Sequence, residues 1–311
     1  MNSAVDSWIL SRRPAREKRD PYLPYEYFVE EECTDRGVVV PVATIFLTNR
    51  ECPFRCLMCD LWRNTLTESV PVGAIAAQID HALPNLPPAR HIKLYNSGSF
   101  FDPHAIPPQD YDAIAQRVHG FDKVIVENHP ALIGDACLRF RDMVSGKLEI
   151  AMGLETAHPG VLARLNKRMT LDQFSAAADF LRRNEIDLRV FILVQPPYMQ
   201  AAEALVWAGR SLDFAMEHGA TAATLIPTRG GNGAMEALGA SGDFSPPALQ
   251  TLESAMEYGL GLKAGRVFAD LWGLRESCAE CHEQRAGRLR QMNLQQIVTD
   301  RIPCNRCGGA S

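Results

Sequence analysis

Short apolar runs alternate with helical patterns along most of the chain. The apolar runs are the predicted strands, at residues 42–48, 91–96, 123–127, 148–154, 188–195 and 221–227. Residues 190–194 are apolar without alternation, which is typical of a strand covered on both faces in a parallel sheet. A capping box at residues 170–173 predicts the start of a helix, and apolar residues continue that helix at the expected spacing.

Six strand–helix units in series predict a parallel α/β fold. An open partial (β/α)6 barrel and a doubly wound sheet both fit this pattern, and in either one the functional residues gather at the carboxyl ends of the strands. Residues 1–40 are charged, and their prolines discourage a long helix. We therefore expect an irregular extension over residues 1–40, an α/β unit over 41–262 and a small C-terminal unit over 263–311.

Composition and charge narrow the class of protein. The chain has 311 residues and a net charge of −5. A protein that wraps a large nucleic acid usually has a basic surface, so the charge gives no support to that function. We expect the basic residues between Arg12 and Arg19 to form a solvated arm rather than an RNA contact. No apolar run reaches the ~18 residues of a membrane span, and no signal peptide stands out. We therefore expect a cytoplasmic protein, in which cysteines bind metals more often than they form disulfides.

Three of the nine cysteines lie in the loop after the first predicted strand. Cys52, Cys56 and Cys59 have the spacing Cys-x3-Cys-x2-Cys, and thiolates packed this densely suit a soft polynuclear metal centre. Iron–sulfur clusters usually take four cysteines, so three leave one iron without a protein ligand, which is typical of a reactive site. The alternative is a zinc site whose fourth ligand lies elsewhere.

Two further cysteine pairs lie near the C-terminus. Cys278 and Cys281 form one Cys-x2-Cys pair, and Cys304 and Cys307 form another, 22 residues further on. The pattern matches a four-cysteine zinc knuckle, which we favour, and also the ligand set of an auxiliary iron–sulfur cluster. The first pair, followed by a histidine, also matches the c-type haem attachment string, which we set aside because no export signal accompanies it.

Polar residues recur where the predicted strands end. They include Asn96, Ser97, Glu127, Glu155 and Gln195. A zwitterionic ligand needs acceptors for its ammonium group and donors for its carboxylate group. Side chains of these types supply both, so the strand ends predict a binding site for such a ligand.

The cysteine motif resembles the signature of the radical S-adenosylmethionine (radical SAM) enzymes. Residues 93–102, 126–130, 153–156 and 165–167 are similar to the archaeosine-synthase radical SAM subunit and its relatives, which are near the elongator-type and methylthiotransferase branches. The resemblance covers roughly residues 42–230. It implies a partial barrel, with the cysteine loop following the first strand.

The resemblance also implies the chemistry. The three thiolates would hold a [4Fe–4S] cluster, and the amino and carboxylate groups of SAM would chelate the fourth iron. The reduced cluster would cleave SAM to methionine and a 5′-deoxyadenosyl radical, which takes a hydrogen atom from the substrate. An electron donor such as flavodoxin or ferredoxin is implied as a partner. Beyond the cluster ligands, no catalytic residue is implied.

Asn96, Ser97 and Gly98 stand where the superfamily commonly has Gly-Gly-Glu against the SAM ammonium group. The usual glutamate is missing, so the resemblance implies that the Ser97 hydroxyl, backbone carbonyls or Glu127 make that contact.

The remaining implied contacts come from other strand ends. Glu155 would face the ribose or methionyl end of SAM, and Lys167 would contact its carboxylate. Met58 stands where many members carry an aromatic residue next to the adenine, and a flexible thioether still covers a ring. Gln195 completes the predicted cofactor contacts.

The substrate is less determined than the cofactor. The branch resemblance favours a base in tRNA or another modified nucleoside, whereas the acidic balance favours a small metabolite or a peptide. A non-catalytic metal-binding or iron–sulfur carrier protein is the alternative from another class. It leaves the polar strand ends without a role.

Overall fold

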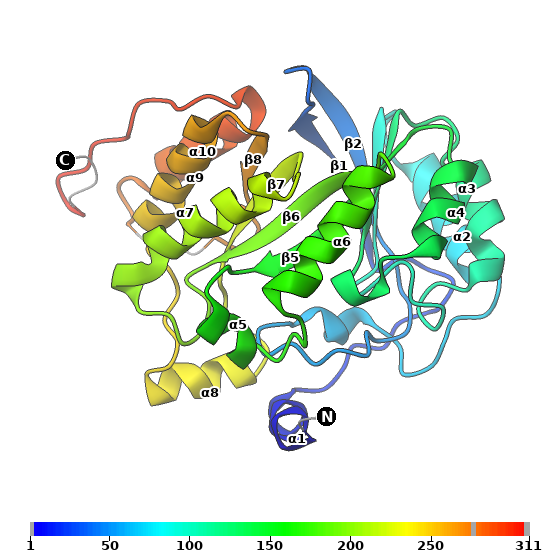
Figure 1. Ribbon diagram of the computed structural model, residues 1–311, viewed down its shortest axis with the longest axis horizontal. Helices are drawn as coiled ribbons and strands as arrows, with labels where there is room; N and C mark the ends of the chain where they lie inside the picture. The colour runs from blue at the N-terminus through cyan, green and yellow to red at the C-terminus, as the bar shows by residue number, and fades with distance from the viewer. Residues whose placement is uncertain (1–2, 275–277, 308–311) are drawn as a thin grey trace.

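The computed structural model describes residues 3–274 and 278–307 and contains one curled sheet (Figure 1). The eight strands are β1 (Glu26–Cys33), β2 (Val39–Phe46), β3 (His91–Tyr95), β4 (Lys123–Glu127), β5 (Lys147–Glu155), β6 (Asp187–Val194), β7 (Ala222–Pro227) and β8 (Arg266–Ala269). They lie in chain order, with β1 antiparallel to β2 and all later pairs parallel. A doubly wound sheet would reverse its strand order at a switch point, so the predicted partial barrel is confirmed, with two strands more than predicted.

The helices surround this half-barrel, and most of them lie along its outside (Figure 1). They are α1 (Ser3–Arg12), α2 (Ala74–Ala82), α3 (Tyr111–Arg117), α4 (Asp135–Met143), α5 (Pro159–Arg164), α6 (Leu171–Arg183), α7 (Ala201–Glu217), α8 (Ala234–Ser241), α9 (Leu249–Leu262) and α10 (His282–Gln295). The predicted capping box is present at the start of α6, where the Thr170 side chain accepts a hydrogen bond from the Gln173 amide.

The N-terminal region differs from the sequence prediction. Residues 1–40, which we expected to be irregular, contain α1 and β1. The helix is short and ends at Arg12, before Pro14, so the prolines limit it without preventing it. The last strand, β8, begins inside the expected C-terminal unit and is only four residues long.

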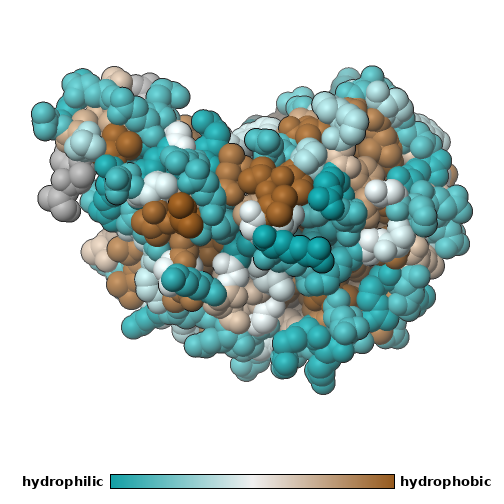
Figure 2. Space-filling model, turned by 90° about the horizontal axis from the view of Figure 1, so that it is seen from above, coloured by the Kyte–Doolittle hydropathy of each residue, from teal (hydrophilic) through white to brown (hydrophobic). Residues whose placement is uncertain are grey.

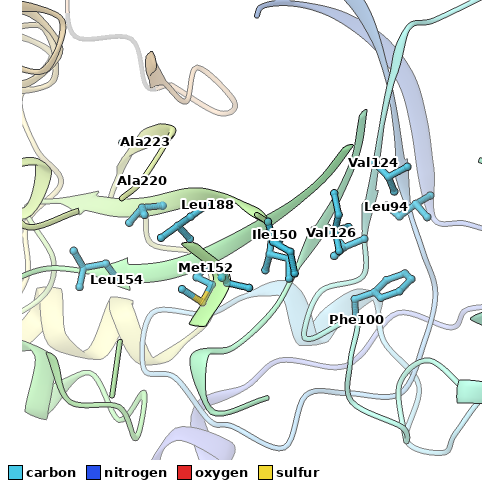
Figure 3. Packing of buried hydrophobic residues seen from close by; sticks show 14 of the residues in the cluster. Leu94, Phe100, Val124, Val126, Ile150, Met152, Leu154, Leu188, Ala220 and Ala223 are labelled. Atoms are coloured by element: carbon cyan, nitrogen blue, oxygen red, sulfur yellow. The ribbon is translucent and has the colours of Figure 1, made fainter. Parts of the chain in front are cut away.

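The outer face of the sheet carries the hydrophobic core. Leu94, Val126, Ile150 and Leu188 belong to one large cluster with residues from the helices (Figure 3). Successive side chains of a strand point to opposite faces, so the residues between them in sequence line the inner face. The core therefore lies between the sheet and the helices, and the inner face is free to carry polar groups.

A network of buried ion pairs occupies the inner face at the amino ends of the strands. The Glu149 carboxylate forms ion pairs with Lys123 Nζ at 2.9 Å, Arg189 Nε at 2.6 Å and Arg266 Nη2 at 3.1 Å. Burial alone would raise the pKa of Glu149, but these three cations hold it well below its ordinary value. Arg189 and Arg266 also pair with Glu32 on β1. These ion pairs join the two edges of the open sheet at this end.

No helix in the described ranges is long and apolar enough to cross a bilayer. Seen from above in Figure 2, the surface is hydrophilic around its rim, with hydrophobic residues gathered near the middle. Val38 and Val39 of the β1–β2 hairpin, at the top of Figure 1, are 52% and 40% exposed.

Glu149→Gln should destabilise the fold by about 3–5 kcal/mol, because it leaves buried cations without their counter-charge. Urea unfolding at pH 7 measures this free energy, with exposed Glu31→Gln as the matched control. The folded-state pKa of Glu149 lies below its unfolded value of 4.5, so its contribution is present above pH 4.5 and is lost as the pH falls. The difference from wild type should shrink in acid. A loss at pH 7 no larger than that of the control would contradict this account.

Candidate cofactor and metal site

The three-cysteine loop lies between β2 and α2, at the carboxyl end of the sheet. Its ends meet at a bridge between Arg50 and Leu66, and this closes the loop at its base. Burial raises the pKa of Cys52, Cys56 and Cys59 to about 12, so the free thiols are neutral near pH 7. Metal binding requires the thiolates and would release these protons.

Two neighbouring segments hold the loop through its backbone. Leu57 donates its amide to the Leu165 carbonyl at 2.9 Å, and Asn166 Nδ2 donates to the Arg55 carbonyl at 2.7 Å. From the other side, Asn232 Nδ2 donates to the carbonyls of Leu57 at 2.8 Å and Cys59 at 3.1 Å. The loop that carries the thiols is therefore positioned before any metal binds.

The basic N-terminal segment packs onto this loop. Glu51 pairs with Arg13 at 2.7 Å, with Arg55 at 3.1 Å and with Arg16. The Arg13 guanidinium lies 4.6 Å from the centre of the Trp62 ring. Our expectation of a solvated arm was wrong for these arginines, because an acidic residue inside the cysteine motif is their counter-ion.

The Asn96–Gly98 turn lies against the cysteine loop. Glu127 Oε1 accepts from the backbone amides of Asn96 at 2.6 Å and Gly98 at 3.3 Å. Burial raises the pKa of Glu127 to about 7, although these amides act in the opposite direction. A Cβ at Gly98 would lie 3.3 Å from the Cβ of Cys52, so the turn comes close to the first thiol.

Asn96 has an unusual side chain. It is fully buried, and within the described part of the chain neither Oδ1 nor Nδ2 has a hydrogen-bond partner. A buried amide in this state costs about 1–3 kcal/mol, so native structures seldom leave one unpaired without a functional reason. This side chain is therefore suited to a polar ligand.

A buried ion pair lies on the other side of the thiols. Lys167 Nζ lies 2.7 Å from Glu155 Oε1. Burial alone would lower the pKa of Lys167, but Glu155 and the thiols of Cys56 and Cys52 raise it above its ordinary value. A Cβ at position 153 would come within 2.7 Å of Lys167 Nζ and even closer to Glu155, so only glycine leaves space for the pair.

Two known proteins resemble this chain in sequence. No protein-family model matches the chain. It is similar to archaeosine synthase subunit beta of Methanosarcina acetivorans, with 24% identity over 284 residues that cover 85% of this chain and 82% of that protein. An uncharacterized protein of Methanocaldococcus jannaschii is 22% identical over 253 residues, covering 76% of this chain and 69% of that protein.

Solved structures share the fold. Methylornithine synthase (PylB) superposes with a TM-score of 0.53 and 14% identity over 84% of this chain and 73% of its own. Streptococcus suis SuiB, bound to its precursor peptide SuiA, superposes with a TM-score of 0.51 and 13% identity over 71% of this chain and 47% of its own. The Cys-x3-Cys-x2-Cys loop stands at the carboxyl end of β2 in this same fold.

The chain resembles the radical SAM enzymes in its cysteine motif and in its fold. The enzymes of this superfamily use a [4Fe–4S] cluster and SAM, so we tested whether the residues fit these groups. Three thiols on one positioned loop fit a cluster with one open iron, and they are electrostatic neighbours of one another. The unpaired Asn96 amide and the Lys167–Glu155 pair supply both donors and acceptors for a zwitterion. The residues therefore fit both groups.

His129 lies beside the cysteine loop, and the sequence reasoning missed it. Its Nδ1 accepts from the Ala131 amide at 3.1 Å, so the ring proton is on Nε2, which donates to the Lys167 carbonyl at 3.0 Å. The imidazole also stacks on Phe54 of the cysteine loop, with ring centres 3.7 Å apart. Burial, then the charge of Lys167, lowers the pKa of His129 to about 3, so the ring is neutral. It follows the β4 strand end in the sequence, which was the available signal.

Two predicted contacts lie at the edge of this arrangement. Gln195 Nε2 donates to the carbonyl of Ser245 at 2.9 Å and to its hydroxyl at 2.8 Å, so its amide donor faces the loop after α8. Met58 packs against two small apolar clusters, one with α1 and α8 and the other with α5 and α7. Met58 lies in the cysteine loop and Gln195 directly follows β6, but the described contacts do not join either residue to the Lys167–Glu155 pair.

The C-terminal cysteines form a second, separate group. Cys278 Sγ lies 3.9 Å from Cys304 Sγ, and Cys281 Sγ lies 3.5 Å from Cys307 Sγ. All four sulfur atoms lie within 4.8 Å of one another, an arrangement that could hold a metal ion. In the described ranges the loop thiols do not form so close a group.

Gly153→Ala should disrupt the site with little effect on the fold, because the added methyl group would displace the Lys167–Glu155 pair. We expect SAM affinity, measured by equilibrium dialysis with the cluster-loaded protein, to fall at least about tenfold, the equivalent of one lost charge-assisted hydrogen bond. Gly287→Ala is the matched control, because no atom lies within 4 Å of a Cβ at that position. Unchanged affinity in Gly153→Ala would contradict the placement of SAM.

Proposed function

We propose that this chain cleaves SAM at a [4Fe–4S] cluster held by Cys52, Cys56 and Cys59 and takes a hydrogen atom from a base in tRNA or a related modified nucleoside. The observation that carries the proposal is the position of the cysteine loop between the Asn96–Gly98 turn and the buried Lys167–Glu155 pair. A carrier of metal would need the thiols but would have no use for these polar groups.

A reduced cluster bound by Cys52, Cys56 and Cys59 would supply the electron for the cleavage of the SAM sulfonium to methionine and a 5′-deoxyadenosyl radical. The residues of this chain bind and orient SAM. Lys167 supplies a cation for the SAM carboxylate, and Glu127, with a pKa near 7, is an acceptor at the Asn96–Gly98 turn. Asn96 gains the hydrogen-bond partners that it lacks. A small electron-transfer protein such as flavodoxin or ferredoxin would reduce the cluster.

The substrate class rests on a relative. Archaeosine synthase subunit beta aligns with 85% of this chain, and its name indicates a modified nucleoside of tRNA as its product. The net charge of −5 favours a smaller substrate. Two solved structures that share the fold also point that way: methylornithine synthase is named for an amino acid, and SuiB is bound to a precursor peptide. We favour the base because archaeosine synthase subunit beta resembles this chain in sequence, and because the alignment covers most of both proteins.

We also propose that the C-terminal cysteines hold one zinc ion. Zinc binds thiolates at about 2.3 Å, so four sulfur atoms around it lie about 3.8 Å apart. The Cys278–Cys304 and Cys281–Cys307 sulfur separations of 3.9 and 3.5 Å are close to this value. The thiolates of a [4Fe–4S] cluster bind four different irons and lie further apart. Arg285, which reaches Cys307 Sγ at 3.8 Å and pairs with Glu253 at 3.0 Å, joins the metal site to α9.

Cys56→Ala should abolish the production of 5′-deoxyadenosine from SAM under strong reductant, with at least a 100-fold loss, because the cluster loses one of its three ligands. Cys137→Ala, on the buried face of α4, is the matched control and should keep both iron and turnover. If Cys56→Ala still produced 5′-deoxyadenosine at the wild-type rate, the assignment of the cluster to this loop would be rejected.

Cys304→Ser should remove zinc and leave the iron of the loop site in place. Metal analysis of the purified variant measures both, and wild type should contain about one zinc for every four irons. Eight irons and no zinc in wild type would show that the C-terminal site is a second cluster.

Bulk tRNA should bind the protein with an affinity that falls steeply with salt, because phosphate contacts release counter-ions. We expect one base of tRNA to change when tRNA is incubated with SAM, reductant and the cluster-loaded protein. Nucleoside analysis measures this change, which should require SAM. Binding that does not depend on salt, together with unchanged tRNA, would favour the small-metabolite or peptide alternative.

A further inference from the structure

Six aromatic rings form one continuous surface on the inner side of the half-barrel. They come from Tyr25, Phe28, Phe46, Tyr95, Phe191 and Trp272, and we call them the aromatic inner surface. Phe46 is at its centre, with ring centres 5.4 Å from Tyr25, 5.9 Å from Phe28, 6.0 Å from Tyr95 and 6.2 Å from Trp272. The rings lie toward the carboxyl half of the strands, above the Glu149 ion network.

The aromatic inner surface is open to solvent, unlike the opposite face of the same strands. Phe46, Tyr95 and Phe191 are only half-buried, whereas their neighbours in the outer core, Ile45 and Leu94, are completely buried. Trp272 is 57% exposed even though it contacts two of these rings. Large aromatic side chains on a sheet normally fill a core, so their exposure together marks a binding surface.

This surface is connected to the proposed SAM site. The Tyr25 hydroxyl lies 2.9 Å from Ser97 Oγ in the turn that we assign to SAM. The charges of Glu127 and of Asp60 in the cysteine loop also act on the Tyr25 hydroxyl. A group resting on Phe46 would therefore lie beside the region where the reactive atoms meet.

Polar groups border the rings at the open edge of the sheet. Asp270 follows β8 and pairs with Arg229 at 3.0 Å, and Glu30 on β1 lies near enough to raise the pKa of Asp270. Burial is the main cause of that raised pKa. Carboxylate and guanidinium groups at a ring edge accept from and donate to the N–H and C=O groups of a heterocycle. An aliphatic substrate would gain little from a surface with this geometry.

We propose that the aromatic inner surface stacks a planar heterocyclic base, with Phe46 and Trp272 as the stacking rings and Asp270 and Arg229 at the edge of the base. This deepens the proposed function, because it names the part of the substrate that enters the half-barrel. Each base has a π-face, and stacking on an aromatic side chain is a recurrent way to hold one outside a duplex.

The test uses the fluorescence of Trp272 in the full-length protein, which reports binding without SAM turnover. Guanosine, adenosine, cytidine and uridine are titrated separately, with ribose 5-phosphate as a probe that lacks a base. We expect saturable quenching by at least one nucleoside in wild type and in Trp207→Phe, and its loss in Trp272→Phe. Trp207 is the matched control, because it packs on His158 with ring centres 4.3 Å apart, on the helix side of the sheet.

Phe46→Leu should weaken nucleoside binding about tenfold, because it removes the stacking ring while keeping apolar bulk. Its thermal unfolding is compared with wild type, and Phe191→Leu is a second variant in case Phe46→Leu unfolds. Quenching by ribose 5-phosphate equal to that by nucleosides, or wild-type affinity in both folded variants, would overturn the proposal.

Bulk tRNA as a further probe distinguishes the source of the base. Loss of tRNA binding in Phe46→Leu would indicate a base presented by RNA, and loss of nucleoside binding alone would indicate a free nucleoside; both support the proposal. The proposed function fails separately, if wild type binds nucleosides but produces no 5′-deoxyadenosine from SAM.

Discussion

The structure depends on the ion pairs around Glu149, because they fill the amino end of the half-barrel and join its two open edges. A sheet that curls without closing leaves two edges, and no backbone hydrogen bonds join β1 to β8. Arg266 spans those edges at the amino end by pairing with both Glu149 and Glu32. Buried charges are stable here since each has an opposite partner within hydrogen-bond distance. With that end filled by charge, the carboxyl end is left for the cysteine loop and the polar strand ends.

Backbone strain is concentrated at this carboxyl end. Ser97, Glu155 and Gln195 each follow or end a strand, and their φ angles are +54°, +66° and +55°. A side chain in this left-handed region costs about 1–2 kcal/mol. All three were predicted as cofactor contacts, from their position at strand ends and from the family resemblance. Strain of this kind persists where the surrounding structure holds a residue for a purpose, so the geometry adds support that the sequence could not supply.

The parts of the fold that were predictable carry a strong local pattern. Strands β2 to β7 have long apolar runs, whereas β1 mixes Phe28 with several glutamates because its inner face contributes to both the aromatic surface and the ion network. A four-residue strand such as β8 carries too few residues for any pattern. The radical SAM motif identified the thiols, since their spacing is a local property.

The interactions that escaped prediction are those between distant segments. The role of His129 depends on Phe54 and on the Lys167 carbonyl, which lie 75 and 38 residues away in the chain. The N-terminal arginines were read as solvated because Glu51, their counter-ion, lies in another motif. Each of these contacts links segments that the fold brings together at the cysteine loop, and no pattern within either segment contains that information.

The central claim is that three thiols leave one iron of a cluster open to SAM. Mössbauer spectroscopy of ⁵⁷Fe-loaded protein, recorded with and without SAM, tests it most directly. The account predicts that about one iron in four changes its spectrum when SAM is added, and that the other three stay the same. A spectrum that SAM leaves unchanged, or one that shows no cluster, would contradict it.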